Sequence, residues 1–408
     1  MPEYVHDFSK VTSVGIGAFA KAHFDGAVNL SKVQTLPNAA DCPEKPEGAD
    51  HDYGVFEESN LEMINLSSLK SIGSRAFCAC QSLGKVDGAS PDNKKETNFI
   101  FPNTTSISAE AFFSSFVDPE TGSYANVTMP LLKTIPDATS NGRGVFEDSK
   151  VCVIDFPELE YIGSKSFKNA RSIGKNKNGD PEVYRSMNKV TYIGEEGFYL
   201  SGYGTSTFRQ YVDFPEVITI GKKAFKDAGI SPGKQDGNLT ILDLPKCTTI
   251  DDEGLTIRTD NIGAPRYRKI YLRSIETIGE YGLAGISVDD TNYRLEIHIG
   301  PNCTNIKRMA FEKINAPAVQ NPIQDQTLTT RKWDLYLYGA PTSLTIQNFD
   351  YNTTGPQWCM PEHIYVPADY VAAYKSKFNQ VGPSHAGIYN DYSPFITSME
   401  LAPNPQNW

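Results

Sequence analysis

Apolar and polar residues recur along this chain in a short phrase that is clearest over residues 151–167 and returns over 211–225. We take as an anchor the apolar residue that precedes each segment resembling Gly-x-x-Ala-Phe. Successive anchors are separated by a base step of about 27 or 28 residues, which indicates stacked repeats. The anchors are Val14, Leu36, Ile72, Ile107, Ile135, Ile162, Ile193, Ile220, Ile250, Ile278 and Ile306. Longer steps contain polar insertions, which we expect to be surface loops.

An apolar, polar, apolar triplet precedes most anchors by six to eight residues. Before Ile162, for example, it consists of Ile154, Asp155 and Phe156. Alternation with a period of two residues is typical of a strand that buries one face. We therefore expect one short strand per repeat, stacked in parallel on the strands of the neighbouring repeats.

Two further columns of residues point to a shared core. A large side chain such as Phe77 or Phe167 stands five positions after the anchor, and a small one such as Cys80 follows three positions later. The Gly after many anchors, such as Gly163, fits a turn that needs an unusual φ or a close backbone approach. Because one coil cannot bury its own apolar face, stacking supplies the missing surface. Cys80 is then a buried small residue rather than a reactive thiol.

The polar middle position of each triplet points away from the predicted core and forms the candidate partner-binding face. Its residues are Asn65, Thr128, Asp155, Ser186, Asp213, Asp243, Tyr271 and His298, the last lying one residue out of register. The three aspartates and Tyr271 predict an acidic patch that ends in an aromatic ring, suited to a basic protein surface or a glycan. An ordinary solvated face is the alternative interpretation.

Composition excludes several classes of function. The 408 residues are 39% apolar and 21% charged, and the formal net charge is −11. This acidic balance argues against nucleic-acid binding, which needs clustered Lys and Arg. No apolar run is long enough for a transmembrane segment. The first residues lack the features of a secretory signal, so either the protein stays inside the cell or a leader has been trimmed.

Motifs for catalysis or metal binding are weak. The seven cysteines form neither a disulfide framework nor a paired zinc spacing. Residues 15–20 match a dinucleotide fingerprint only by letters, since they belong to the repeat phrase. Ser384 and His385 miss the nucleophile-elbow spacing by one residue. We therefore predict no catalytic, cofactor or metal site, and no enzyme activity.

Residues 72–83, Ile-Gly-Ser-Arg-Ala-Phe-Cys-Ala-Cys-Gln-Ser-Leu, resemble the repeat unit of the BspA-like leucine-rich repeat surface proteins. Residues 364–375 resemble the closing segment of that family, and the repeat resemblance covers residues 11–316. It implies an α/β repeat solenoid, a right-handed horseshoe or superhelix with one short parallel strand per repeat. The return segments would be mostly turns or short helices.

The anchors and the resemblance together predict two parts. Residues 1–316 would form a leucine-rich repeat solenoid of about eleven repeats, with an N-terminal cap in the first dozen residues. Residues 317–408 would form terminal strands and a C-terminal cap, because the last coil of a solenoid must be covered. Within this part we expect strands near 333–338 and 363–366 and a short helix over about 369–378.

Family members are typically secreted or surface-anchored adhesion and recognition proteins. The resemblance implies a non-enzymatic cell-surface protein that binds a protein or glycan, host ligands included, through its repeat face or inserted loops. A structural or virion-type component, such as a phage tail or assembly protein, is the alternative, and it would explain the missing leader. The expected location is extracellular or on the cell surface if a leader was removed, and unknown otherwise.

Overall fold

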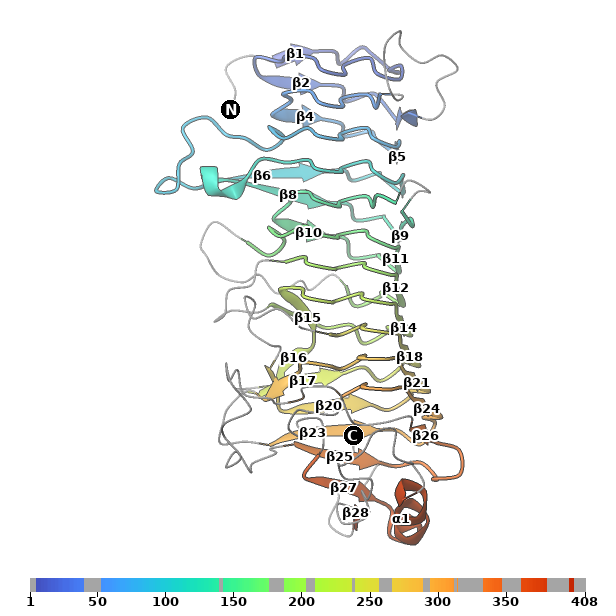
Figure 1. The fold of residues 1–408 in the computed structure, drawn as a ribbon. Coiled ribbons are helices and arrows are strands. Elements are labelled where there is room, and N and C mark those ends of the chain that lie inside the picture. The colour runs from blue at the N-terminus through green and yellow to red at the C-terminus, as the bar shows by residue number, and fades with distance from the viewer. Residues whose placement is uncertain are drawn as a thin grey trace. The chain divides into compact units, whose positions relative to one another are not determined.

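The computed structural model describes residues 5–39, 53–138, 142–175, 187–202, 210–236, 239–256, 266–288, 294–311, 314, 333–346, 361–379 and 396–399. Its contacts divide the chain into two compact units. Unit 1 comprises Met1–Val212 with Ala228–Ile230, and unit 2 comprises Asp213–Asp227 with Ser231–Trp408. Each unit is a stack of coils whose strands form parallel ladders from one coil to the next (Figure 1).

Unit 1 contains longer strands and two-residue strands. The longer ones are β1 (Val5–Asp7), β2 (Ala27–Asn29), β4 (Met63–Asn65), β6 (Lys95–Ile100), β8 (Ser123–Thr128), β10 (Val153–Asp155) and β13 (Gln210–Val212). The short ones are β3 (Thr35–Leu36), β5 (Ser71–Ile72), β7 (Ser106–Ile107), β9 (Thr134–Ile135), β11 (Tyr161–Ile162) and β12 (Tyr192–Ile193). Ladders run in the orders β1-β2-β4, β6-β8-β10, β3-β5-β7 and β9-β11-β12. The 3₁₀ helix η2 (Pro119–Thr121) precedes β8.

Unit 2 repeats this arrangement. Its longer strands are β16 (Lys234–Asp236), β17 (Leu239–Asp243), β20 (Lys269–Leu272), β23 (Leu295–Ile299), β25 (Trp333–Leu337), β27 (His363–Val366) and β28 (Ile396–Ser398), which form one sheet in this order. All neighbours in this sheet are parallel except the antiparallel pair β16 and β17. The short strands β14 (Thr219–Ile220), β18 (Thr249–Ile250), β21 (Thr277–Ile278), β24 (Asn305–Ile306) and β26 (Thr345–Ile346) form a second ladder.

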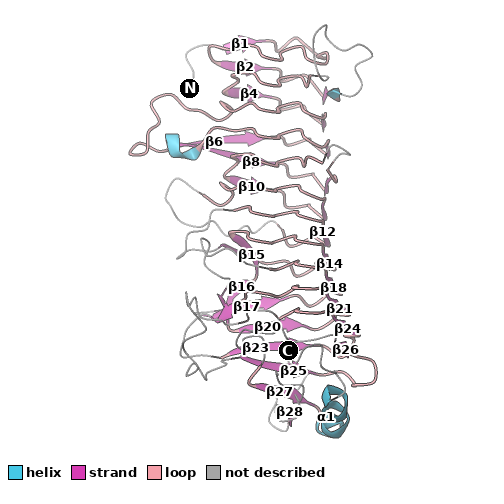
Figure 2. Ribbon diagram, viewed as in Figure 1, coloured by secondary structure: helices cyan, strands magenta, loops and turns pink. Residues whose placement is uncertain are grey.

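A few elements lie outside these ladders. β19 (Arg266–Tyr267) pairs with β22 (Ser287–Val288), and β15 (Ile230–Pro232) crosses the boundary between the units. The 3₁₀ helix η3 (Ala368–Tyr370) leads into α1 (Val371–Asn379). Figure 2 shows that strands and loops dominate the chain. β25, β27 and α1 confirm the strands expected near 333–338 and 363–366 and the short helix expected near 369–378.

The prediction of one strand per repeat is wrong, because the coils contain a second, two-residue strand at the anchor. In β11, Ile162 pairs with Ile135 on one side and Ile193 on the other. The sequence did not reveal this strand, because two residues are too few to show alternation. Its ladder is made of main-chain hydrogen bonds, which do not depend on the type of side chain. The α/β class also needs correction, since α1 is the single α-helix in the described part of the chain and the return segments are turns. Each unit is a repeat solenoid of β coils.

Stacked phenylalanines confirm the predicted core column in unit 1. Rings of successive coils lie nearly parallel, with centroid distances of 5.4 Å for Phe56 and Phe77, 5.0 Å for Phe77 and Phe112, 5.1 Å for Phe112 and Phe146, 5.3 Å for Phe146 and Phe167, and 5.1 Å for Phe167 and Phe198. All six rings are fully buried. Offset stacking of this kind adds to the free energy of burial. Cys80, beside this column, is fully buried as predicted.

The glycine after the anchor serves close approach. A Cβ on Gly163 would lie 2.3 Å from the backbone of Pro136 in the preceding coil, and one on Gly73 would lie 2.1 Å from the carbonyl oxygen of Pro37. The left-handed φ falls instead two residues later, at Arg75 (58°) and Lys165 (55°). Gly is needed here because neighbouring coils touch through their main chains.

The predicted boundary between residues 316 and 317 lies outside the described residues. Strands on both sides of it belong to one sheet, in which Ile297 pairs with Leu335. The anchor ladder also continues, because Ile306 pairs with Ile346. At the other end, β1 pairs in register with β2, so residues assigned to the N-terminal cap already form a strand of the stack.

Candidate functional site

The candidate face of unit 1 begins with an amide ladder. Asn29 donates from Nδ2 to Oδ1 of Asp7 over 3.1 Å, and Asn65 donates in the same way to Oδ1 of Asn29, also over 3.1 Å. These side chains occupy equivalent positions on β1, β2 and β4. The ladder confirms that Asn65 points away from the core. It also shows that the amides mainly bind one another.

Thr128 and Asp155 lie on a different sheet of unit 1. They pair directly, on β8 and β10, and Thr128 also pairs with Ile100 of β6. Asp155 is exposed, as predicted, and Ile100 is 58% exposed. Ser186, the next predicted member of the face, lies outside the described residues.

The predicted acidic patch needs correction in unit 2. The carboxylate of Asp243 lies 3.0 Å from Nζ of Lys234 and 2.6 Å from a guanidinium nitrogen of Arg273. Its charge is therefore compensated. Burial raises the pKa of Asp213, although Lys234 acts in the opposite direction. The repeat pattern gave no sign of Lys234, because that residue lies in β16, a strand that pairs antiparallel with β17 and has no counterpart among the described parts of the other repeats.

An aromatic ladder occupies the outer face of the same sheet. Tyr271, His298, Tyr336 and Tyr365 are direct register partners on β20, β23, β25 and β27. Their ring centroids are 4.9, 4.3 and 4.7 Å apart in that order. We call these four residues the aromatic ladder. Two of them, Tyr271 and His298, belong to the predicted face.

The sequence prediction missed Tyr336 and Tyr365. The anchor phrase lapses after residue 315, so no column could be extended to them. The alternation in 333–338 and 363–366 was the available signal, but it did not identify the partner strand. His298 was placed one residue out of register, whereas it pairs exactly opposite Tyr271. Counting from the anchor failed because this repeat has one extra residue between its strand and Ile306.

His298 lies at the centre of the ladder and is only 2% exposed. Its Nε2 lies 3.2 Å from Oε2 of Glu296, and its Nδ1 lies 3.1 Å from the hydroxyl of Tyr338. The carboxylate can only accept, so Nε2 donates to Glu296 and Nδ1 accepts from Tyr338. Burial lowers the pKa of His298, with Glu296 opposing. The imidazole is therefore neutral near pH 7, with both nitrogens bound.

Charged side chains flank the ladder in compensated groups. Arg294 contacts the carboxylate of Asp334 through two nitrogens, at 2.8 and 2.9 Å, and reaches Glu362 at 2.6 Å. His363 lies 3.0 Å from Asp334 through Nδ1. Lys269 lies 3.1 Å from Glu296. The face thus presents many hydrogen-bonding groups whose charges largely cancel.

The hydroxyls of Tyr336 and Tyr365 differ from the bound nitrogens of His298 in their hydrogen bonding. Tyr336 and Tyr365 are half-buried, and within the described part of the chain neither hydroxyl has a hydrogen-bond partner. Burial raises the pKa of both phenols, so both keep their protons at neutral pH. A tyrosine hydroxyl that is partly withdrawn from water usually finds a partner. These two groups are available to an incoming ligand.

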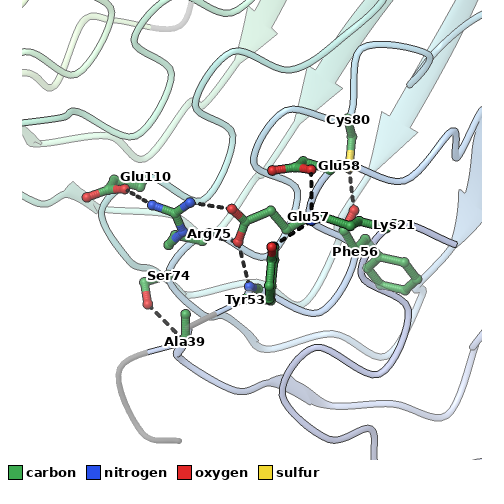
Figure 3. A network of polar contacts seen from close by, with 11 residues as sticks. Lys21, Ala39, Tyr53, Phe56, Glu57, Glu58, Ser74, Arg75, Cys80 and Glu110 are labelled. Atoms are coloured by element: carbon green, nitrogen blue, oxygen red, sulfur yellow. Dashed lines mark hydrogen bonds and ion pairs between the residues drawn. The ribbon is translucent and has the colours of Figure 1, made fainter. Parts of the chain in front are cut away.

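Unit 1 holds a second polar cluster, which is buried (Figure 3). Arg75 lies between two carboxylates, with Nε 3.0 Å from Oε2 of Glu57 and a terminal nitrogen 3.0 Å from Oε2 of Glu110. Glu57 also accepts from the backbone nitrogen of Gly54 over 2.7 Å. The hydrogen bond with Glu57 raises the pKa of Arg75. Both carboxylates are occupied in joining coils, so this cluster is structural.

Neither metal ligation nor membrane spanning is suggested within the described ranges. They contain no group of three or more His, Cys, Asp or Glu side chains placed to hold a metal ion. They also contain no helix long and apolar enough to cross a membrane.

Comparison with known proteins finds a family model that matches part of the chain. Residues 52–174 match the BspA type leucine-rich repeat region, in six copies. Among solved structures, a pneumococcal vaccine antigen, PcpA, is 12% identical over 86% of this chain and 76% of its own, with a TM-score of 0.25. So low a score supports no inference about function. No curated protein matches the chain.

Proposed function

We propose that this protein, which carries BspA-type leucine-rich repeats over residues 52–174, is a non-enzymatic recognition and adhesion protein of the cell surface. It binds a protein or glycan partner through the outer face of the unit 2 sheet. The observation that carries the proposal is the aromatic ladder of Tyr271, His298, Tyr336 and Tyr365.

Core packing does not account for the ladder. The core of unit 2 is built by Ile270, Ile297 and Leu335, which are fully buried on the opposite face of the same strands. Tyrosine is enriched at protein interfaces because it presents a large contact area with few rotatable bonds. A row of tyrosines on the outer face, two of whose hydroxyls have no hydrogen-bond partner among the described residues, therefore fits recognition better than stability.

The cysteines support a role without nucleophilic catalysis. Burial raises the pKa of the Cys80 and Cys152 thiols to about 12, so neither forms a thiolate near neutral pH. A screen with activated esters and glycosides tests this part of the proposal. Turnover by the purified chain would contradict it.

The surface location rests on the family, whose members are typically secreted or surface-anchored. The alternative, a structural or virion-type component, places the chain inside an assembly. Mild protease treatment of intact source cells separates the two. Release of fragments of this protein into the medium supports a surface location, and full protection contradicts it.

Two double variants test the binding face. Tyr336→Ala with Tyr365→Ala removes half of the ladder, and Tyr161→Ala with Tyr192→Ala removes the stacked pair of unit 1, whose centroids are 4.6 Å apart. The probe is an array of extracellular-matrix proteins and glycans, with the full chain applied in solution. We expect binding to weaken at least about tenfold in the first variant alone, as for interface hot spots. Equal binding by both variants would instead implicate the inserted loops.

A further inference from the structure

We infer that the ligand of the aromatic ladder is a neutral, linear glycan that lies along the ladder and crosses the strands β20, β23, β25 and β27. This inference rests on the proposed function, since it takes the outer face of unit 2 as the binding face. It replaces the open choice between a protein and a glycan with one class of partner.

Charge is the first argument. Lys269 is paired with Glu296, Arg294 with Asp334 and Glu362, and Arg273 with Asp243. A charged partner would have to compete for groups that already have oppositely charged neighbours. The central His298 carries no charge when it donates to Glu296 and accepts from Tyr338. The surface therefore favours a ligand that forms hydrogen bonds without carrying charge, as a polyhydroxylated sugar does.

The orientation of the rings is the second argument. Tyr336 stacks on His298 with an interplanar angle of 12°, and Tyr365 stacks on Tyr336 with an angle of 18°. Their ring faces are covered by one another, so the ladder presents ring edges and hydroxyls. The hydroxyls of Tyr336 and Tyr365 can each donate one hydrogen bond and accept one. A glycan supplies hydroxyls that match both roles.

Spacing is the third argument. The groups of the ladder recur once per strand, at centroid distances between 4.3 and 4.9 Å. An extended β-linked sugar chain advances by a similar distance for each residue. Successive sugars can therefore meet successive strands, with Tyr271, Tyr336 and Tyr365 as the points of contact, because His298 is only 2% exposed.

Preorganisation is the fourth argument. Tyr271 and Tyr336 pack against His298 from either side, and the imidazole is held through both of its nitrogens. Side chains that are already ordered lose little entropy when a ligand binds. Glycan hydroxyls form individually weak contacts, so a rigid row of donors and acceptors is an advantage.

The test uses native gels that contain a neutral, β-linked polysaccharide, with laminarin, β-mannan and xylan run separately. We expect at least one of them to retard the full chain. Tyr336→Phe combined with Tyr365→Phe keeps the stacked rings and removes only the two hydroxyls. It should raise the dissociation constant about tenfold, since each lost hydrogen bond contributes modestly. Tyr161→Phe combined with Tyr192→Phe, the matched control in unit 1, should bind like the unmodified chain.

Salt and charge provide a second readout. Retardation should persist between about 0.05 and 0.5 M NaCl, because salt screens interactions between exposed charges and a neutral glycan carries none. Retardation by heparin or alginate but by none of the neutral polysaccharides would overturn the inference. So would neutral binding that the hydroxyl-deficient variant retains in full.

The array experiment distinguishes this failure from that of the proposed function. If the alanine variant loses binding to an arrayed protein while no neutral polysaccharide binds, the face is a recognition site for a protein and the glycan inference is wrong. If no arrayed partner depends on Tyr336 and Tyr365, both proposals fail.

Discussion

The outer columns of the two units share one backbone geometry and differ in chemistry. In unit 1, Asp7, Asn29 and Asn65 stand on successive parallel strands, and each asparagine donates to the residue before it. In unit 2, Tyr271, His298, Tyr336 and Tyr365 stand in the same relation, but rings stack where amides bond. In the amide ladder, Asn29 uses a donor and its acceptor oxygen to hold its two neighbours. In the aromatic ladder the rings stack, so the hydroxyls of Tyr336 and Tyr365 take no part in holding the ladder together.

The same contrast separates the scaffold of a repeat protein from its outer face. Parallel stacking places like positions about 4.8 Å apart, whatever side chains occupy them. In both units the inner positions must be buried. The outer positions need not be buried, so a row of like side chains there becomes a ladder whose chemistry depends on residue type alone.

The largest predicted effect tests the shared scaffold. Phe167→Ala removes a fully buried ring that stacks on Phe146 and Phe198, and should lower the free energy of unfolding by about 3–5 kcal/mol. Chemical denaturation measures this loss. The exposed Ile100→Ala serves as the control and should change stability by less than about 0.5 kcal/mol. Similar effects of the two variants would show that the columns are not assigned correctly.

A smaller loss is expected from the buried ions of unit 1. Arg75→Ala leaves Glu57 and Glu110 without their cation, and these are only 1% and 5% exposed. We expect a loss of about 3 kcal/mol, the lower end for a broken buried pair, because 18% of the Arg75 side chain reaches solvent. Lys133→Ala breaks the exposed pair with Glu160 and should leave stability almost unchanged, because both side chains are well solvated. Equal losses would mean that burial does not distinguish the two sites.

The ladders themselves should differ in strength. Tyr336→Ala removes contacts with two stacked rings and should cost about 1–3 kcal/mol, including stacking of about 0.5–1.5 kcal/mol. Asn29→Ala removes two largely exposed hydrogen bonds and should cost no more than about 1 kcal/mol. Thermal melts of both variants compare them. A larger loss for Asn29→Ala would reverse the ranking.

The smallest effect is a dependence on pH. Because burial lowers the pKa of His298 in the folded state, the unfolded chain binds the proton more readily. Stability should therefore fall as the pH drops from 7 through the ordinary histidine pKa of about 6.5 towards the lower folded value. His298→Asn should remove this part of the slope, as measured by melting temperatures between about pH 5 and 7. An unchanged slope would show that His298 does not titrate differently on folding.

The amide ladder should respond in a different range. Hydrogen bonds from Ser9 lower the pKa of Asp7, so its contribution to stability is lost only when the pH falls below about 4. Glu296 also has a lowered pKa: burial raises it, but His298 and Lys269 together outweigh this. Neither carboxylate should titrate between pH 5 and 7, so the difference in slope between the unmodified chain and His298→Asn reports on His298 rather than on these two groups.

Much of the fold followed from the sequence. Phe167 and Ile162 recur in columns because each must be buried against the next coil, and burial leaves a readable pattern. The two-residue strand at Ile162 was missed, since its pairing depends on main-chain bonds. The charge of Asp243 was misjudged because Lys234, its partner, lies in a strand outside the repeat.

The candidate face was predicted less completely than the core. Tyr271 and His298 were found by counting from anchors, which also put His298 one residue out of register. Tyr336 and Tyr365 were out of reach, because the count ends where the anchor phrase lapses. Register is set by hydrogen bonds between paired strands, and the paired residues of the ladder are 27 to 38 positions apart in the chain. The length of the segment between two strands therefore does not reveal which residues pair.

The repeat solenoid and the side chains of its core can be predicted from the sequence, because the hydrophobic effect acts on every coil in the same way. The composition of the outer face emerges only once the strands are paired. Solvent accepts almost any side chain there, so no periodic constraint marks the functional ones. The aromatic ladder exists because strand pairing brings four distant residues into one row, and that pairing cannot be read from any single repeat.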